Sequence, residues 1–361
     1  FEKTISSINY QKIMSLGDKA IRPEEKLTRI YPQKNLFSHI IGQIDNENNG
    51  ISGLEKSFDE ELKKRNKPLQ LTVDTDIQYL IRKELSKYQK IFDAKGGAAI
   101  LMNVNNGEIL SMVSLPDFDL NKRETIVDVN YINRVTKGTY ELGSVFKTFT
   151  IASGINHGLI EPETKFLDSK KSINCGDGYT INEYDNKMPS DLSVENILIK
   201  SGNIGSVRIV RKIGVEKHKS FLETIGILDK ISFDIDEVGK PLKIDWNEGC
   251  KIETIAFGHG ITTTILQLAK GYAIISNGGY EITPTLIKDN TNKKIKRLKV
   301  LSNDVSKKMN IMMRKVVSEG TAKLVNVEGY QVGGKTGTAE QVSNSIYSKT
   351  KINTLASIFP T

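Results

Sequence analysis

Apolar and polar residues follow two periods along the chain, and each period predicts a different kind of element. Two apolar runs, 98–104 and 108–113, lie on either side of Asn105-Asn106-Gly107. An Asn-Gly turn between apolar runs favours a β-hairpin. Residues 354–359 have the pattern of a further strand, and a strand from Leu69 is expected to lead into a helix that begins near Thr75. That helix is indicated by apolar residues at helical spacing, which are Ile77, Leu80, Ile81, Leu85 and Tyr88.

A second helix is predicted from Ser144, because apolar residues recur at helical spacing at positions 145, 146, 149, 152 and 155. Gly158 marks its expected C-terminal end. Ile151 falls outside the apolar stripe, so we expect this helix to be buried on most sides. Residues 192–200 and 204–210 are predicted to form two more helices. A sheet with the helix from Ser144 packed behind it would give an α+β fold.

Length and charge exclude some classes of function. The 361 residues are enough for two domains and a large core. The formal net charge is +8, but no basic run is interleaved with aromatic residues, which argues against a nucleic acid partner. The lysines are expected to form a solvated surface. No stretch of about 18 apolar residues occurs, so no segment of this chain is expected to span a membrane.

The cysteines and histidines do not indicate a metal centre. Cys175 and Cys250 could form a disulfide in an oxidising compartment. They lack Cys-x-x-Cys spacing, so a zinc site is not expected. The four histidines show no ligand spacing, and His259, which stands between two glycines, is expected to be structural. We therefore expect neither a metal nor a cofactor.

Three short motifs occur in a fixed order: Ser144-x-x-Lys147, Ser201-x-Asn203 and Lys335-Thr336-Gly337. Together they describe a serine acyl-transfer site with its proton-handling groups and a cationic anchor. Each motif alone is weak, because Ser-x-x-Lys and Ser-x-Asn also occur elsewhere in the chain. These additional matches are Ser348 with Lys351, Ser7 with Asn9, and Ser172 with Asn174, the last of which is interpreted as part of a glycine-rich loop.

The first motif stands at a predicted helix start. Residues three apart share a helix face, which places the Lys147 amine near the Ser144 hydroxyl. Unpaired N–H groups at a helix start favour developing negative charge. Burial and the nearby charge of Lys335 should lower the pKa of Lys147, so that it can act as a general base. A capping serine and a lysine that reaches the surface are the alternative for an isolated motif.

The second and third motifs have simple alternatives of their own. Ser201 and Asn203 lie in a turn between two predicted helices, where they could point into a cleft or simply cap a helix. Residues 335–339 are predicted to start an exposed strand, although a glycine-rich turn is the alternative. Gly337 would allow another backbone to approach closely. Lys335, Thr336 and Thr338 would offer a positive charge and hydroxyls to a carboxylate, and such a strand can pair with an extended peptide.

The chain resembles the class B penicillin-binding proteins, which are peptidoglycan D,D-transpeptidases, and it is most similar to the division (septum) type. The resemblance implies that residues 1–66 are the C-terminal part of a pedestal domain and that 67–361 form the transpeptidase domain. It also implies a single-pass inner-membrane anchor, absent from this chain, and a periplasmic catalytic domain. The similarity is carried by the three motifs together with 29–32, 51–59, 71–74, 140–144, 257–260, 267–269, 277–279 and 319–322.

The resemblance also implies that a last strand and a final helix follow residue 361. That strand would insert between the strand at 98–104 and the strand at 354–359. We therefore expect the catalytic domain of this chain to lack part of its sheet, with two strand edges left unpaired.

The resemblance implies a two-step reaction. Ser144 attacks the D-Ala-D-Ala bond of a peptidoglycan stem peptide, and an amine of a neighbouring stem peptide resolves the acyl-enzyme. Backbone N–H groups of Ser144 and Thr338 would form the oxyanion hole, and Lys147 would take the serine proton. Ser201 and Lys335 would help to protonate the leaving amine, and Asn203 would orient Lys147 and the substrate amide. β-Lactams would acylate the same serine, and divisome membrane proteins including a glycosyltransferase would be partners.

Four alternatives share the acyl-enzyme chemistry. An elongation-type transpeptidase would use the same site. A β-lactamase needs a base that activates water, and the class A pattern Glu-x-x-Leu-Asn does not occur between the second and third motifs. A D,D-carboxypeptidase would release the acyl group to water, although the pedestal resemblance argues against it. A β-lactam sensor would keep the serine without turning over stem peptides.

Overall fold

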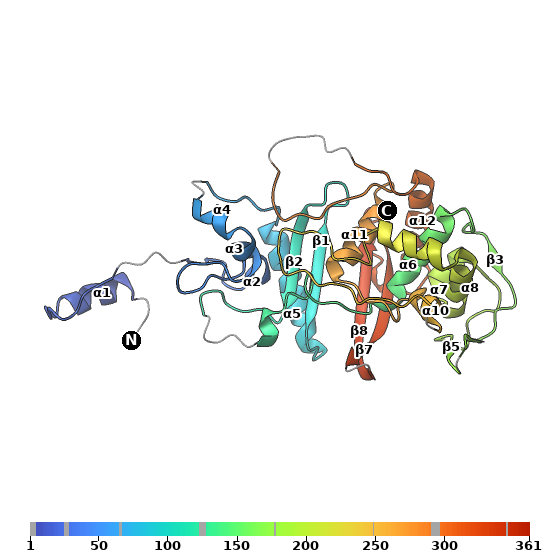
Figure 1. Ribbon diagram of the computed structural model, residues 1–361, viewed down its shortest axis with the longest axis horizontal. Coiled ribbons are helices and arrows are strands. Elements are labelled where there is room, and N and C mark those ends of the chain that lie inside the picture. The colour runs from blue at the N-terminus through green and yellow to red at the C-terminus, as the bar shows by residue number, and fades with distance from the viewer. Residues whose placement is uncertain are drawn as a thin grey trace.

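A computed structural model describes residues 5–24, 29–64, 67–122, 128–176, 178–247, 249–289, 297–343 and 346–361. The molecule is elongated, with the N-terminal segment at one end and a helical lobe at the other (Figure 1). Four two-stranded antiparallel sheets lie among the described residues, and helices surround them. This is the α+β arrangement that the sequence predicted.

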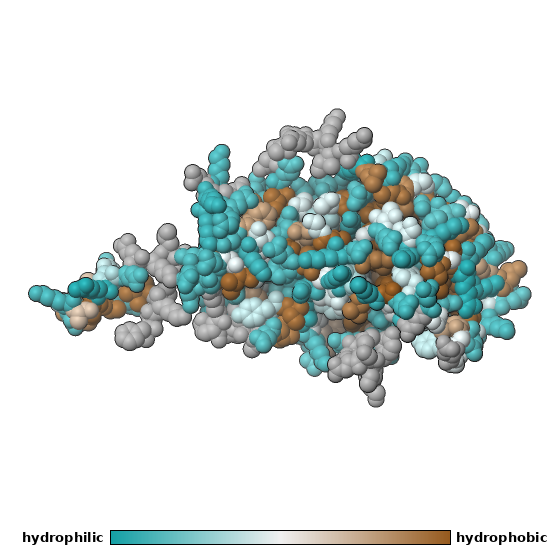
Figure 2. All heavy atoms as spheres, viewed as in Figure 1, coloured by the Kyte–Doolittle hydropathy of each residue, from teal (hydrophilic) through white to brown (hydrophobic). Residues whose placement is uncertain are grey.

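The region before residue 65 contains only short helices in its described parts. Helix α1 extends away from the body, and none of its residues is buried (Figure 1). Figure 2 shows apolar atoms on this protruding segment, where Ile8 and Leu16 are 66% and 74% exposed. The expected domain boundary falls on Arg65 and Asn66, which lie outside the described residues. The four helices are α1 (Ser7–Met14), α2 (Ser38–Ile41), α3 (Gly53–Ser57) and α4 (Asp59–Lys64).

Two hairpins form the main strands. Strands β1 (Gly97–Met102) and β2 (Ile109–Leu115) pair around the Asn-Gly turn, as the sequence predicted. Strands β7 (Gly333–Ser343) and β8 (Ile346–Ile358) form the second antiparallel pair. Within the described chain β1 and β8 belong to separate sheets, so no strand joins the two hairpins. The expected strand between them concerns residues after 361 and stays a prediction.

Helices pack on both hairpins and on one another. Helix α5 (Thr75–Ile91) packs on β1 and β2, and α11 (Ile265–Ser276) contacts β1 and β8. Helix α12 (Asn303–Ser318) packs on β7. The other elements are η2 (Asp128–Tyr131), η3 (Gly143–Phe146), α6 (Lys147–Asn156), α7 (Val194–Lys200), α8 (Asn203–Ile213), α9 (Val215–Thr224), α10 (Lys251–Ile255), η4 (Lys323–Val325), β3 (Lys165–Phe166), β4 (Ser172–Asn174), β5 (Thr180–Asn182) and β6 (Leu192–Ser193).

Helix α6 lies at the centre of the largest apolar cluster. All nine residues from Lys147 to Ile155 are buried, which confirms the prediction of burial on most sides. The helix contacts α7, α8, α9 and α12, so its immediate surroundings are largely helical, whereas the preceding η3 turn contacts β7 and β8. Gly158 follows the helix with φ of 65°, a left-handed conformation that suits a helix end.

Three predicted elements differ in detail. The first turn of the Ser144 segment is a 3₁₀ helix, and α6 begins only at Lys147. The strand expected from Leu69 is reduced to an isolated bridge between Leu71 and Ile287, because its neighbour there is a loop and not a strand. Residues 192–193 pair with β3 before α7 begins at Val194. The first and last residues of a helix or strand depend on such tertiary contacts, which the local sequence pattern does not show.

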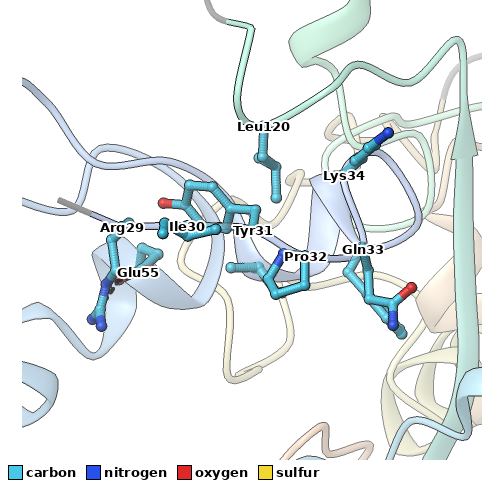
Figure 3. A pocket seen from close by; sticks show the side chains of 10 residues that line it. Arg29, Ile30, Tyr31, Pro32, Gln33, Lys34, Glu55 and Leu120 are labelled. Carbon is cyan, nitrogen blue, oxygen red and sulfur yellow. Dashed lines mark hydrogen bonds and ion pairs between the residues drawn. The ribbon is translucent and has the colours of Figure 1, made fainter. Parts of the chain in front are cut away.

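A cavity of about 230 Å³ lies between the region before α5 and the segment after β2, and none of its lining residues belongs to the three motifs. Leu120 covers one side of it, opposite Tyr31 and Pro32, and Arg29 lies beside Glu55 (Figure 3). Arg29 Nε and Glu55 Oε1 form an ion pair at 3.1 Å. The cavity is therefore associated with the packing of residues 29–41 on the body of the protein.

Cys175 and Cys250 form the disulfide that the sequence left open. Cys175 follows β4, and Cys250 precedes α10. The bridge ties the small β4–β5 hairpin to the helical lobe. No helix in the described part of the chain is both long and apolar enough to cross a membrane.

The disulfide should stabilise the fold measurably, because it closes a loop with a sequence separation of 75. Replacing both cysteines, as Cys175→Ser with Cys250→Ser, is expected to cost about 2–4 kcal/mol of unfolding free energy. Thermal unfolding without reductant measures this as a lower midpoint. Ser172→Ala, an exposed change on the same hairpin, is the control and should keep the wild-type midpoint. Equal midpoints for the double variant and the wild type would contradict the prediction.

Candidate active site

Ser144 lies in a turn that two glycines allow to approach strand β7. Gly143 has φ of 63°, and a Cβ atom there would lie 2.4 Å from the carbonyl oxygen of Thr338. A Cβ atom on Gly337 would lie 2.3 Å from the carbonyl oxygen of Leu142. Any side chain at either position would force the turn and the strand apart. The two glycines therefore place Ser144 beside the Lys-Thr-Gly strand, as the motif order suggested.

Lys147 occupies the first position of α6, and its side chain is completely buried. Its Nζ donates hydrogen bonds to Ser201 O at 2.5 Å, to Ser201 Oγ at 3.1 Å and to Asn203 Oδ1 at 2.8 Å. No hydrogen bond of the Ser144 hydroxyl is found among the described residues. Such bonds are often long in unliganded enzymes and tighten when substrate binds.

Ser201 and Asn203 lie between two helices, as predicted. Ser201 ends α7 in a left-handed conformation with φ of 59°, and Asn203 begins α8. This sharp turn directs both the carbonyl and the hydroxyl of Ser201 to Lys147. A non-glycine residue in this conformation is strained, and such strain is common where side chains must be aimed.

Lys335 approaches the same hydroxyl from strand β7. Its Nζ donates to Ser201 Oγ at 2.9 Å and to the carbonyl of Thr336 at 2.9 Å, and the residue is 0% exposed. Two lysine amines thus share one serine hydroxyl. The structure brings together residues from all three motifs, although the first and the last are separated by more than a hundred positions along the chain.

Burial makes both amines unusually acidic. Desolvation lowers the pKa of Lys147 well below the ordinary lysine value, the charge of Lys335 lowers it further, and the charge of Glu183 opposes the shift. Desolvation lowers the pKa of Lys335 to about 7. A buried ammonium loses its hydration, so the neutral amine is favoured in both cases. A neutral amine can accept a proton, which is the property that a general base needs.

The exposed side of β7 offers hydroxyls beside Lys335. Thr336 Oγ1 donates to Thr321 Oγ1 at 2.9 Å, and Thr338 Oγ1 donates to Asn353 Oδ1 at 3.3 Å. A Cβ atom on Gly143 would be 3.0 Å from the backbone nitrogen of Thr338, so this nitrogen lies close to the Ser144 turn. The two backbone donors expected to form an oxyanion hole are therefore neighbours.

Sequence reasoning missed the residues that hold the motifs in place. Glu183 accepts hydrogen bonds from the backbone of Asn203 and Ile204, and the carbonyl of Asn182 accepts one from the Asn203 side chain. Tyr272 donates its hydroxyl to the carbonyl of Val145 at 2.9 Å. These partners come from distant parts of the chain and carry no local signal. The segments 257–260 and 319–322, which carry the family resemblance, pointed to two neighbours of the site. These are Gly258, whose carbonyl accepts from the backbone N–H of Gly143 at 3.3 Å, and Thr321.

The additional motif matches lie in other settings. Ser7 and Asn9 are part of α1, and Ser348 is on β8 rather than at a helix start. Ser172 and Asn174 form strand β4, so the interpretation of this segment as a loop was wrong. The apolar Ile173 between them packs beside Ile181 and Ile204, which favours a strand over a loop.

Comparison with known proteins agrees with the geometry. Residues 97–361 match the family described as the penicillin binding protein transpeptidase domain. The chain is 31% identical over 360 residues to the probable peptidoglycan D,D-transpeptidase FtsI of Caulobacter vibrioides, covering 97% of this chain and 60% of that protein. It is 29% identical to the stage V sporulation protein D of Bacillus subtilis, covering 96% and 59%.

A solved structure of similar fold is also a penicillin-binding protein. The apo crystal structure of penicillin binding protein 3 from Mycobacterium tuberculosis superposes with a TM-score of 0.83 at 25% identity, covering 92% of this chain and 81% of that chain. The chain spans about 60% of the length of the first curated relatives that it matches. The family match covers most of the chain, and the fold agrees with the solved relative. The chain therefore belongs to the penicillin-binding protein transpeptidase family, among its class B members.

Proposed function

We propose that this protein is a peptidoglycan D,D-transpeptidase that works through an acyl-enzyme on Ser144. The observation that carries the proposal is the pair of buried lysine amines around Ser201 Oγ, next to the Ser144 turn. Two amines with lowered pKa values, one hydroxyl between them and a nucleophile beside them form a relay for moving one proton. Residues 67–361 are proposed to be the catalytic domain.

The acylation step uses the groups of this relay. Ser144 Oγ attacks the carbonyl carbon of the penultimate D-Ala, and its proton passes to neutral Lys147 Nζ. The developing oxyanion accepts hydrogen bonds from the backbone N–H groups of Ser144 and Thr338, and one such donor stabilises the transition state by about 2.7–4 kcal/mol. The C–N bond then breaks, and the leaving amine takes the proton held by Lys147, which is relayed through Ser201 and Lys335.

The deacylation step reverses these roles. An amine of a neighbouring stem peptide attacks the ester carbonyl and loses one proton to neutral Lys147 through Lys335 and Ser201. The C–O bond to Ser144 then breaks, and Ser144 takes this proton from Lys147. Lys335, Thr336 and Thr338 face the position of the substrate carboxylate, and Gly337 lets the peptide lie against β7 as an added strand. Asn203 holds the Lys147 amine, with its Oδ1 atom 2.8 Å from Nζ.

We propose the division type as the cellular role. The similarity to the FtsI protein of Caulobacter vibrioides supports this role. The chain is also similar to stage V sporulation protein D of Bacillus subtilis, whose name gives a role in sporulation. A periplasmic position at the inner membrane and divisome partners including a glycosyltransferase belong to the same proposal. β-Lactam inhibition is supported by solved complexes of the Mycobacterium tuberculosis relative with ampicillin and aztreonam.

Ser144 should be the residue that a penicillin acylates. A fluorescent penicillin is expected to label the wild type, because the Ser144 hydroxyl attacks the amide bond of the β-lactam ring and opens it. The Ser144→Ala variant should stay unlabelled. Ser348→Ala, which removes the serine of the other Ser-x-x-Lys match, is the control and should label like the wild type. Gel fluorescence and intact mass measure the outcome. A Ser144→Ala protein that still carries the label would refute the assignment.

The acylation rate should depend on the protonation of Lys147. Only the neutral amine accepts the serine proton, so the rate should rise with pH and level off well below the ordinary lysine pKa of about 10.4. Lys147→Ala should lose about 10²–10⁴-fold in rate with the fold intact. Stopped-flow acylation between pH 5 and about 10 measures the profile. A wild-type rate that still climbs at the upper end would contradict a lowered pKa.

Lys335 should act mainly as the anchor of the carboxylate. With a pKa of about 7 it carries part of a positive charge near neutral pH, and a bound carboxylate favours the charged form. Lys335→Ala is therefore expected to lose more acylation rate with a penicillin than with its uncharged methyl ester. Lys351→Ala, an exposed lysine on β8, is the control and should react like the wild type. Equal losses with both compounds would exclude the anchoring role.

A further inference from the structure

A small hairpin lies over the start of helix α8. Strands β4 and β5 pair antiparallel, and their apolar residues Ile173 and Ile181 pack with Ile204 and Val207 of α8. The disulfide to Cys250 also ties the end of β4 to the segment before α10. The hairpin is thus attached to the helical lobe by its apolar residues and by a covalent bond, although none of its residues belongs to the three motifs.

The chain leaving β5 makes three hydrogen bonds to the first residues of α8. Glu183 Oε2 accepts from the backbone N–H of Asn203 at 2.8 Å, and Oε1 accepts from that of Ile204 at 2.9 Å. The carbonyl of Asn182 accepts from Asn203 Nδ2 at 3.0 Å. The first N–H groups of a helix have no partner within the helix, so a carboxylate here satisfies two of them and meets the positive end of the helix dipole.

These bonds leave the Asn203 amide with one favourable orientation. Because Nδ2 donates to Asn182, Oδ1 must point the other way, where it accepts from Lys147 Nζ at 2.8 Å. A flipped amide would place its NH₂ group against the lysine amine and its oxygen against a carbonyl. The oxygen–carbonyl contact would be repulsive, and the NH₂ group would compete for the lone pair that neutral Lys147 needs as a base.

We propose that Glu183 is a positioning residue of the acylation site, which fixes the start of α8 so that Asn203 presents its oxygen to Lys147 and which also places a negative charge near that amine. The inference rests on the proposed acylation of Ser144 with Lys147 as the base. Glu183 acts through Asn203 and through its charge.

The charges around Lys147 set the direction of the electrostatic effect. Lys335 approaches the amine from β7, and Glu183 lies in the segment after β5. Desolvation lowers the pKa of His259, and the charge of nearby Lys147 adds to this shift. Desolvation and Lys335 lower the pKa of Lys147, and Glu183 alone among these groups raises it. Removing the negative charge should therefore lower the pKa of Lys147 further and move the acidic limb of the acylation profile to lower pH.

The test compares Glu183→Gln with Glu183→Asp, using acylation by a fluorescent penicillin across pH. Glu183→Gln keeps the shape but loses the charge and one acceptor, so its plateau rate should fall about tenfold and its acidic limb should move to lower pH. Glu183→Asp keeps the charge but shortens the reach, so its plateau should fall while the limb stays near the wild-type position. A purely structural role would lower the rate without moving the limb.

Asp185→Asn is the matched control, because it removes a negative charge from the same loop at a carboxylate that accepts from the backbone N–H of Lys187. It should leave the plateau and the limb unchanged. The proposal is overturned if Glu183→Gln behaves like Asp185→Asn, or if its plateau falls with no shift of the limb. If Glu183→Gln does not fold, a wild-type plateau in Glu183→Asp overturns it. Failure of the proposed function is recognised separately, by labelling of Ser144→Ala or by no labelling of the wild type.

Discussion

Two lysine amines that share one buried serine hydroxyl are the constraint on which the site depends. Lys147 Nζ and Lys335 Nζ lie 3.1 and 2.9 Å from Ser201 Oγ, and both side chains are 0% exposed. An unpaired buried charge costs several kcal/mol, and two like charges this close repel each other. The neutral form is therefore favoured at one amine at least. Burying two lysines costs stability, but the same burial keeps an amine neutral, so that it can accept a proton as the general base.

The fold provides this burial by surrounding α6 with helices and by pressing the η3 turn against β7. Phe146 and Phe149, which flank Lys147 along the chain, belong to the main apolar cluster, and Tyr272 holds the carbonyl of Val145 in the turn. Strand β7 lies against the Ser144 turn at the distance that Gly143 and Gly337 permit. The amines are desolvated because rigid elements converge on them from several directions, which is also why the side chains have little freedom to move apart.

Local patterning predicted what short stretches of chain determine. The β1–β2 hairpin, the burial of α6 and the pairing of α7 and α8 around Ser201 follow from apolar periodicity and turn residues. The motif order predicted which side chains would meet, and the structure brings Lys147, Ser201 and Lys335 together. The bridge at Leu71, the strand at 172–174 and the contacts of Glu183 depend on partners far away in the sequence. No window of neighbouring residues contains that information.

The acidic neighbour of the site acts against the low pKa of the base, because a negative charge favours protonated Lys147. Its carboxylate oxygens accept the backbone N–H groups of Asn203 and Ile204 at the positive end of α8, which stabilises the charged carboxylate there. Desolvation and Lys335 then still lower the pKa of Lys147, while the same carboxylate keeps Asn203 aligned with the amine. The alignment of Asn203 and the low pKa of Lys147 are thus compatible, because the Glu183 carboxylate hydrogen-bonds to the start of α8 and acts on Lys147 only through its charge.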